Sequence, residues 1–273
     1  MKAFEIGAKK TMVFYLHGLR GHAYAQKQAL EHMVRHVGVS VISLELPGHG
    51  GDSVSENCMV PAYADLVSDI KHEVVQQSMH AEQVILMGYS FGASLMTLAA
   101  KALSEDESFK PNVVGFIGVS SGFDVGHNVK PWKLRMNGVV APISRFLFEN
   151  FRSLSRFVTI REMDIGLISP DKSVRQSIHD DPLVYKGRIP LYTSAQVYHA
   201  GLKAKASINK LSFPVLLLHS QDDKIALVPS VGDFDNHVVL RLFKELRHNC
   251  IDGLTREAVV SRKAITKFIS DKL

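Results

Sequence analysis

Short apolar segments alternate with amphipathic segments along most of the chain. The uninterrupted apolar runs, which we expect to form buried strands, are residues 11–16, 39–44, 83–87, 113–119, 213–218 and 238–243. Between them, apolar residues fit one helical face over residues 26–37, 61–78 and 93–100, and again from about residue 255. Strands that are apolar throughout and alternate with helices are typical of a parallel sheet covered on both faces. The pattern therefore predicts an α/β fold with a mostly parallel central sheet flanked by helices.

The alternation stops between residues 120 and 211. Apolar side chains there are interleaved with arginines, and short amphipathic helices are expected instead of sheet strands. A long insertion in a compact domain commonly has a functional role. We therefore predict a core of residues 1–120 and 212–273 and a helical cap of residues 121–211. The cap either lines an apolar pocket or packs on its own core, and its arginine-interleaved surface is also suited to transient contact with a membrane.

A serine lies between two glycines at the end of one predicted strand. The segment Gly88-Tyr89-Ser90-Phe91-Gly92 joins the apolar run 83–87 to an apolar helix. In a turn this tight, side chains at the glycines would collide with their neighbours, and the hydroxyl would stand at a helix N-terminus that favours negative charge. Such a pentapeptide also arises by chance, but the strand and helix supply the context of a nucleophile elbow. Ser90 is the candidate nucleophile, supported by Gly88 and Gly92.

A serine hydroxyl needs a general base, and the base needs a carboxylate to orient it. In an elbow protein the expected order along the chain is serine, acid, histidine. His248 follows the last predicted strand and is the candidate base, whereas His219 and His237 are placed less favourably. The acid is Asp222 or Asp223, and the small apolar pair that closely follows favours Asp223.

Acyl transfer also needs hydrogen-bond donors for a tetrahedral oxyanion. The backbone N–H of Phe91, directly after the nucleophile, is one candidate, and that of Leu19, in the loop after the first clear strand, is the other. His17 and Gly18 precede Leu19, and His17 is expected to support the loop rather than to carry a proton. The mechanism requires no metal and no cofactor.

The composition narrows the class of protein. Hydrophobic residues make up 46% of the 273 residues, which is ample for a large core, and no apolar run reaches the ~18–20 residues of a membrane-spanning helix. Cys58 and Cys250 are the two cysteines; with no apolar secretory signal at the start, they favour a cytoplasmic location. The net charge of +5 is spread along the chain, so no nucleic-acid partner is expected. The oligomeric state stays open.

The chain resembles the α/β-hydrolases over about residues 11 to 270. The residues that carry this resemblance are His17-Gly18, Leu46-Pro47-Gly48-His49-Gly50, Gly88-Tyr89-Ser90-Phe91-Gly92, Asp223 and His248. Within that superfamily, Asp181-Pro182-Leu183-Val184-Tyr185 and the run 213–219 resemble the monoacylglycerol lipase and lysophospholipase group. The resemblance implies a serine esterase that cleaves fatty-acyl esters, with monoacylglycerols or lysophospholipids as substrates, through an acyl-enzyme intermediate.

Alternatives remain open at this point. A thioesterase or an acyltransferase would use the same residues, because another nucleophile can resolve the acyl-enzyme. A non-catalytic α/β-hydrolase that binds a ligand or partner protein would typically lack a catalytic residue, and none is lost here. The sequence departs from the group at Glu45, where Asp is frequent. Its N-terminus is too short for the usual leading hairpin, so the sheet is expected to lack a strand. Asp252 is expected to cap the terminal helix.

Overall fold

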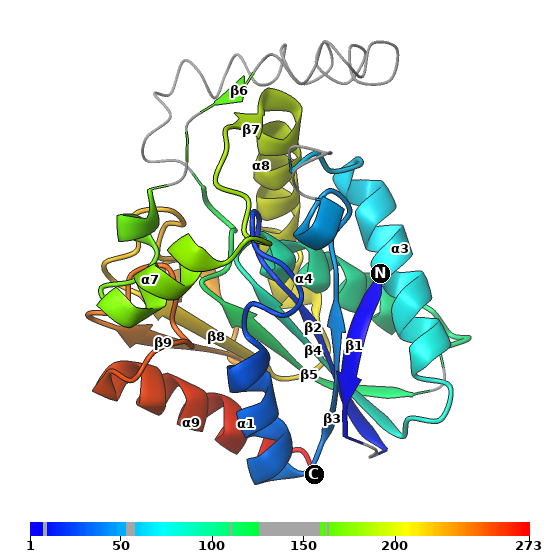
Figure 1. Ribbon diagram of the computed structural model, residues 1–273. Coiled ribbons are helices and arrows are strands. Elements are labelled where there is room, and N and C mark those ends of the chain that lie inside the picture. The colour runs from blue at the N-terminus through cyan, green and yellow to red at the C-terminus, as the bar shows by residue number, and fades with distance from the viewer. Residues whose placement is uncertain (8–9, 53–57, 110, 126–158, 161, 163) are drawn as a thin grey trace.

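A seven-stranded sheet forms the centre of the molecule (Figure 1). The computed structural model describes residues 1–7, 10–52, 58–109, 111–125, 159–160, 162 and 164–273. In spatial order the strands are β1 (Lys2–Ile6), β3 (Ser40–Leu44), β2 (Thr11–Leu16), β4 (Gln83–Tyr89), β5 (Asn112–Val119), β8 (Val215–Ser220) and β9 (Val238–Phe243). Every neighbouring pair is parallel except β1 and β3. The predicted α/β fold with a mostly parallel sheet is confirmed.

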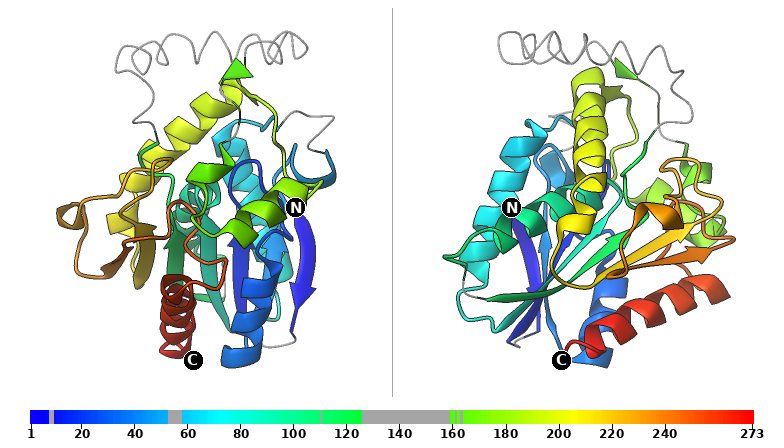
Figure 2. Two further views of the ribbon diagram at one scale, coloured as in Figure 1. Left: turned by 60° about the vertical axis from the view of Figure 1, so that its left-hand side comes forward. Right: turned by 180° about the vertical axis from the view of Figure 1, so that it is seen from behind.

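Helices cover both faces of this sheet (Figure 2). One face carries α1 (Lys27–Val37) and α9 (Arg256–Ser270), and the other carries α3 (Tyr63–Gln77), α4 (Phe91–Ser104) and α8 (Leu191–Lys205). The predicted helices at 26–37 and 61–78 differ from α1 and α3 by only one or two residues at their ends. Gly38 ends α1 with φ 74°, the left-handed conformation for which glycine is suited.

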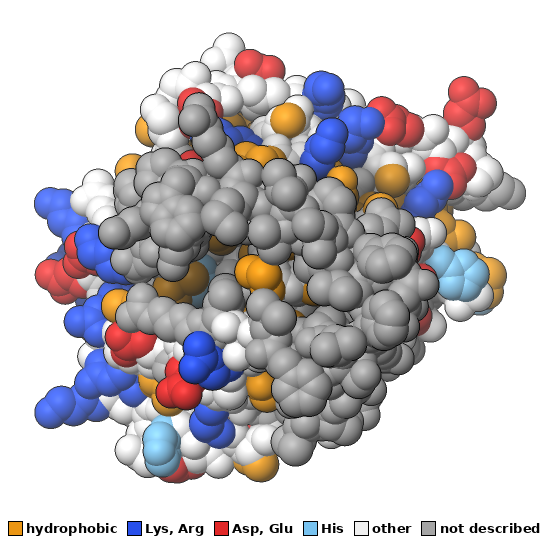
Figure 3. All heavy atoms as spheres, turned by 90° about the horizontal axis from the view of Figure 1, so that it is seen from above, with side chains coloured by type: hydrophobic (Ala, Val, Ile, Leu, Met, Phe, Trp, Pro, Cys, Tyr) orange, Lys and Arg blue, Asp and Glu red, His pale blue; other side chains and the backbone are white. Residues whose placement is uncertain are grey.

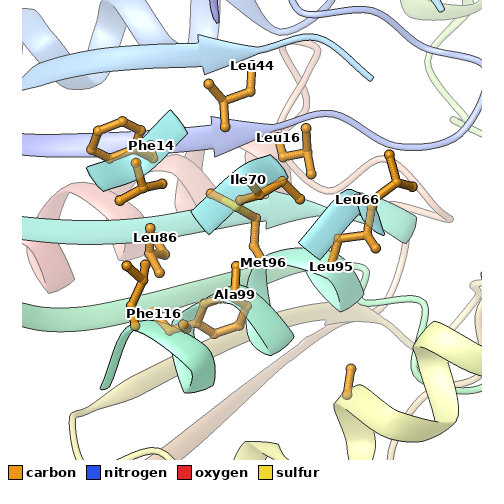
Figure 4. Packing of buried hydrophobic residues seen from close by; sticks show 14 of the residues in the cluster. Phe14, Leu16, Leu44, Leu66, Ile70, Leu86, Leu95, Met96, Ala99 and Phe116 are labelled. Atoms are coloured by element: carbon orange, nitrogen blue, oxygen red, sulfur yellow. The ribbon is translucent and has the colours of Figure 1, made fainter. Parts of the chain in front are cut away.

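The apolar strands fill two cores because successive side chains point to opposite faces. Phe14 and Leu16 of β2 pack in the cluster beneath α3 and α4 (Figure 4), whereas Val13 and Tyr15 pack in the cluster beneath α1 and α9. All four side chains are fully buried. Burying a side chain of the size of Phe or Leu contributes about 1.5–3 kcal/mol. Strands that are apolar on both faces therefore explain the layered architecture.

A single strand, β1, precedes β2 in the described part of the chain, in place of the leading hairpin for which the N-terminus was predicted to be too short. β1 runs antiparallel to β3, with Glu5 opposite Ile42 and Ile6 opposite Val41. The Phe4 ring stacks on the Tyr24 ring with 4.8 Å between centroids. β1 itself was not predicted; a single short strand can pair with the open edge of β3, and no hairpin is needed to supply its hydrogen bonds.

The N-terminus of α9 differs from the prediction at Asp252. The cap is Thr255, whose side chain accepts a hydrogen bond from the Ala258 N–H. Asp252 instead accepts hydrogen bonds from the side-chain amides of Gln26 (3.2 Å) and Asn249 (2.7 Å). Asp252 lies too far before the first helical turn to cap it, and it joins the loop after β9 to the start of α1.

The cap was predicted for the segment between β5 and β8, of which residues 126–158, 161 and 163 lie outside the described part. Besides α8 and a short 3-10 helix, Ile208–Lys210, the remainder holds the 3-10 helix η2 (Ile165–Leu167), helix α7 (Lys172–Asp180) and a two-stranded antiparallel pair, β6 (Thr159–Ile160) with β7 (Ile189–Pro190). That strand pair was not predicted, and it is separate from the central sheet. The surface predicted to contact a membrane belongs mainly to residues that lie outside the described part.

Helix α8 extends from the cap region into the core. Val197, Ala200 and Ala204 are buried in the cluster with α3 and α4. A Cβ atom at Gly201 would lie 2.2 Å from the Gly122 carbonyl oxygen, so this helix passes close to the chain that leaves β5. The division into core and cap stays a prediction, and α8 contacts both regions. Within the described part of the chain, no helix is long and apolar enough to cross a membrane.

Candidate active site

Ser90 lies on the turn between β4 and α4, at the carboxyl end of the sheet. Its φ of 54° and ψ of −119° place a non-glycine residue in a strained conformation. The Ser90 N–H donates to the Val119 carbonyl (2.9 Å), and the Ser90 carbonyl accepts from the Gly122 N–H (3.0 Å). These bonds to the end of β5 and the chain beyond it hold the turn, so the strain persists in the folded protein. Ser90 itself is half-buried.

The glycines on either side of this turn leave no room for a side chain. A Cβ atom at Gly88 would lie 2.5 Å from the Ala93 nitrogen, and one at Gly92 would lie 2.3 Å from the His17 carbonyl oxygen. Both neighbours are backbone atoms that cannot rotate away. The glycines therefore allow α4 to return tightly over β4 and let the loop after β2 approach the turn.

His248 stands between Ser90 and Asp223. The His248 Nε2 atom is 2.8 Å from Ser90 Oγ, and His248 Nδ1 is 2.7 Å from Asp223 Oδ2. With Nδ1–H donating to the carboxylate, Nε2 is free to accept the serine proton. His248 comes from the loop after β9 and Asp223 from the loop after β8, so the parallel strands bring all three side chains to one edge of the sheet.

Asp223, rather than Asp222, contacts the histidine. The Asp223 side chain is fully buried, and its Oδ1 accepts from the N–H groups of Ile225 (2.8 Å) and Ala226 (3.0 Å), whereas Asp222 is exposed. Burial alone would raise the pKa of Asp223, but the charge of His248 and hydrogen bonds from neighbouring imidazoles lower it below its ordinary value. The carboxyl group is therefore ionised at neutral pH.

The structure adds two side chains to this arrangement that the sequence did not assign to it. His219 Nε2 lies 3.1 Å from the Ala226 carbonyl oxygen and 3.3 Å from Asp223 Oδ2, so it borders the carboxylate from the side of β8. The Tyr89 ring packs against the His248 ring with 5.2 Å between centroids. Tyr89 directly precedes Ser90 and His219 lies near the end of β8, shortly before Asp223, and this proximity in the chain was the available signal for both. Each restricts how its neighbour can turn.

Of the two expected oxyanion donors, Phe91 follows Ser90 directly, and Leu19 belongs to a loop that approaches Ser90. Phe91 is the first residue of α4, where backbone N–H groups have no partner within the helix. Gly18 approaches so closely that a Cβ atom there would lie 3.0 Å from Ser90 Cβ, and Leu19 follows directly. The structure thus brings the loop after β2 to the elbow.

His17 lies beneath this loop. It is fully buried, with Nδ1 2.8 Å from the Gly18 carbonyl oxygen and Nε2 2.6 Å from Glu45 Oε1. Glu45 also accepts from the Ala23 N–H (3.2 Å). Burial opposes ionisation of Glu45, but the hydrogen bond from His17 and the charge of that imidazole lower its pKa. Glu45, at the position where Asp is frequent in the group, thus contacts the buried His17 side chain.

A neutral histidine–cysteine pair lies next to His17. His49 Nδ1–H donates to the Pro47 carbonyl (2.9 Å), and the Cys58 thiol is 3.0 Å from His49 Nε2. Burial lowers the pKa of His49 to about 3 and raises that of Cys58 to about 12, so the thiol donates to the unprotonated nitrogen. Over the described residues, no group of three or more His, Cys, Asp or Glu side chains is arranged to hold a metal ion.

A mostly parallel sheet with a serine on a strained turn after its central strand, and with acid and histidine on later loops, is the architecture of an α/β-hydrolase. The chain belongs to the serine aminopeptidase, S33, family, whose model matches residues 7–252. It is a hydrolase of the lipase and esterase type.

Relatives and solved structures agree with this family. Mouse monoglyceride lipase is 22% identical over 221 residues, which cover 80% of this chain and 67% of the mouse protein. A monoglyceride lipase homolog of monkeypox virus is 24% identical over 266 residues, covering 95% and 88%. The crystal structure of Paleococcus ferrophilus monoacylglycerol lipase superposes with a TM-score of 0.78 at 17% identity and covers 100% of this chain and 99% of that one. At 17% identity, this structural match supports the fold alone.

Proposed function

We propose that Ser90, His248 and Asp223 form the catalytic triad of a serine esterase that cleaves fatty-acyl esters, with monoacylglycerols as the favoured substrate class. The observation that carries this proposal is the continuous hydrogen-bonded path from Ser90 Oγ through the imidazole to the buried carboxylate. A neutral serine is a weak nucleophile, and a base at hydrogen-bond distance is what activates it.

In the proposed acylation step, Ser90 Oγ attacks the ester carbonyl carbon while His248 Nε2 takes the hydroxyl proton. The carbonyl oxygen becomes an oxyanion, which the N–H groups of Phe91 and Leu19 stabilise. His248 then returns the proton to the departing alcohol oxygen as its bond to the acyl carbon breaks. Asp223 stays ionised and stabilises the imidazolium.

Deacylation repeats these steps with water. His248 takes a proton from the water as its oxygen attacks the acyl carbon, and then gives the proton to Ser90 Oγ when the free fatty acid leaves. A thioester substrate or an alcohol acceptor would use the same groups. Comparing water, alcohol and thiol acceptors in one assay distinguishes hydrolysis from acyl transfer.

Two observations support an apolar acyl substrate. The relatives from mouse and monkeypox virus carry the names monoglyceride lipase and monoglyceride lipase homolog. In the view from above, some apolar side chains of the described residues are visible near the middle of the face (Figure 3). Hydrolysis of a series of esters from short to long acyl chains, with glycerol and lysophospholipid head groups, tests the substrate class.

The test of the triad is Ser90→Ala, which should abolish hydrolysis of p-nitrophenyl acyl esters and labelling by a fluorophosphonate probe. Ser94→Ala is the matched control. Ser94 lies one turn further along α4, and its buried hydroxyl has no hydrogen-bond partner among the described residues, so this variant should keep its activity. Undiminished turnover of folded Ser90→Ala protein would refute the proposal.

The proposal extends to the cellular compartment. A cytoplasmic location is supported by Cys58 and Cys250, which are both free and buried. Fractionation of cells that express the chain, with an activity assay on each fraction, tests this location. Recovery of the activity only outside the cytoplasm would contradict it.

A further inference from the structure

The loop that carries Leu19 is tied to a segment far away in the sequence. We name residues 17–22 the oxyanion loop and residues 181–187, which follow α7, the strap. His22 Nε2 lies 2.8 Å from Asp181 Oδ2. The Tyr185 N–H donates to the Arg20 carbonyl (2.9 Å), and the Arg20 guanidinium donates to the Gly187 carbonyl (2.6 Å). The strap therefore holds the oxyanion loop through both backbone and side-chain contacts.

The His22–Asp181 contact has a defined direction. His22 Nδ1 accepts from the Tyr24 N–H (3.2 Å), so the proton of the neutral imidazole is on Nε2, which donates to Asp181 Oδ2. The other carboxylate oxygen accepts from the Leu183 N–H (2.8 Å), and Lys186 Nζ donates to the Asp181 carbonyl (2.6 Å). The His22 side chain is only 3% exposed. Both carboxylate oxygens of Asp181 thus accept a hydrogen bond, one from the oxyanion loop and one from the strap.

The oxyanion loop depends on such outside contacts. Arg20 has φ 70°, a left-handed conformation that an arginine adopts at some energetic cost. Within the loop, one backbone hydrogen bond closes a turn, from the Gly21 N–H to the Gly18 carbonyl (3.2 Å). A strained loop keeps one conformation only when its surroundings determine it.

The strap is itself joined to the other side of the triad. The residues that lead into the strap include η2 and α7. Near η2, the Asn249 N–H donates to the Ile168 carbonyl (2.7 Å), and the Arg247 guanidinium donates to the Gly166 carbonyl. Those two residues flank His248. The connection from the His248 loop through residues 166–187 to the oxyanion loop therefore gives the strap a fixed support.

From these contacts we infer that His22 and Asp181 are positioning residues, which hold the Leu19 N–H at the place where the oxyanion develops. The inference rests on the proposed function, because it assigns Leu19 to the oxyanion site. A donor must be held within about 0.5 Å of its productive position to stabilise the transition state. Neither His22 nor Asp181 takes part in the proton transfers.

Asp181→Ala removes both acceptors and should loosen the loop, which keeps its contacts with Tyr185 and Gly187 through Arg20. Loss of one oxyanion donor lowers kcat by about 10²–10³-fold. Because Leu19 stays in the chain and still samples its position, we expect a loss of about 10–100-fold in kcat, with KM changed less than twofold. Asp180→Ala is the matched control: its exposed carboxylate accepts from Gln176 and does not contact the oxyanion loop.

The decisive readout uses a trifluoromethyl ketone with the same acyl chain as the ester substrate. Ser90 Oγ adds to its carbonyl carbon while the proton passes to His248, and the resulting oxyanion needs the Leu19 donor. In Asp181→Ala, the inhibition constant should rise by about the same factor as kcat falls. Concentrations of competent enzyme are set by fluorophosphonate titration, so a loss of folded protein alone changes neither ratio.

The double variant His22→Ala with Asp181→Ala should be no worse than Asp181→Ala alone, since the two side chains act as one unit. Should Asp181→Ala fail to fold, Asp181→Asn keeps one oxygen for either His22 or Leu183, and an intermediate loss is expected. A kcat and a ketone affinity equal to those of Asp180→Ala would overturn the inference. Absence of esterase activity in the unmodified chain would instead refute the proposed function, so the two failures are distinguishable.

Discussion

The substitution Asp223→Asn tests the proposed mechanism most directly, because the surroundings dictate how the amide must sit. Oδ1 of Asp223 accepts from two backbone N–H groups, those of Ile225 and Ala226. The oxygen of the substituted amide would keep this place, since an NH₂ group there would face two donors. The NH₂ group must then point at His248 Nδ1, which is 2.7 Å from the second carboxylate oxygen in the native protein.

This orientation inverts the tautomer of His248. Nδ1 becomes the acceptor, the proton moves to Nε2, and Nε2–H then points at Ser90 Oγ, 2.8 Å away. The base is thus already protonated when the substrate arrives. The corresponding substitution in a serine protease lowers kcat by about 10⁴-fold. That factor equals about 5 kcal/mol of transition-state stabilisation, and we expect a loss of this order here.

The assay is steady-state hydrolysis of a p-nitrophenyl ester by Asp223→Asn and by the control Asp222→Asn. Asp222 is exposed, so its variant should have native kcat and KM. Thermal unfolding of each variant separates misfolding from a chemical defect. A folded Asp223→Asn protein that keeps kcat within about tenfold of the native value would refute the reasoning, because the inverted tautomer leaves no base for Ser90.

Three further predictions concern the fold around the site. Gly92→Ala places a methyl group 2.3 Å from the His17 carbonyl oxygen and should lower the unfolding free energy by about 1–3 kcal/mol, measured by denaturant titration; unchanged stability would contradict it. Burial raises the pKa of Cys58 and Cys250 to about 12, so neither thiol should react with Ellman's reagent at pH 8 until the protein is unfolded, and rapid native labelling would contradict this. The lowered pKa of Asp223 makes its folded carboxyl bind a proton less readily than the unfolded one. Its stabilising contribution is therefore present above about pH 4 and lost as the pH falls further, and Asp223→Asn should show a smaller decrease of Tm between pH 5 and 3; equal decreases would contradict the assignment.

The alternation of apolar strands and amphipathic helices was sufficient to predict the core of the fold. The strand from 11 to 16 and the helix from 26 to 37 have the predicted bounds to within a residue, because their apolar periodicity matches the buried faces of β2 and α1. β1 was missed because five residues at an edge need only one neighbour and carry little pattern of their own. The β6–β7 pair was missed for the same reason, since each strand has two residues.

The site was only partly predictable. The tight turn at Ser90 was predictable from the two glycines around it, of which Gly88 meets the neighbouring Ala93, whereas Gly92 meets the distant His17. By contrast, the sequence offered Asp252 as a helix cap, and the structure places it in a bond network with Gln26, which is 226 residues away. The same holds for His219, whose approach to Asp223 depends on how the loop after β8 folds back.

The sequence by itself determined the order of strands and helices, the tight turn at Ser90 and the candidates for base and acid, because these follow from local apolar patterns, from the glycines and from position after a strand. Only the tertiary structure decided which side chains meet across long separations. It set Asp223 rather than Asp222 against His248, and it joined His22 to Asp181, 159 residues further on. Hydrogen bonds have a reach of about 3 Å, so the packing of the sheet and its loops, rather than local propensity, selects these pairs.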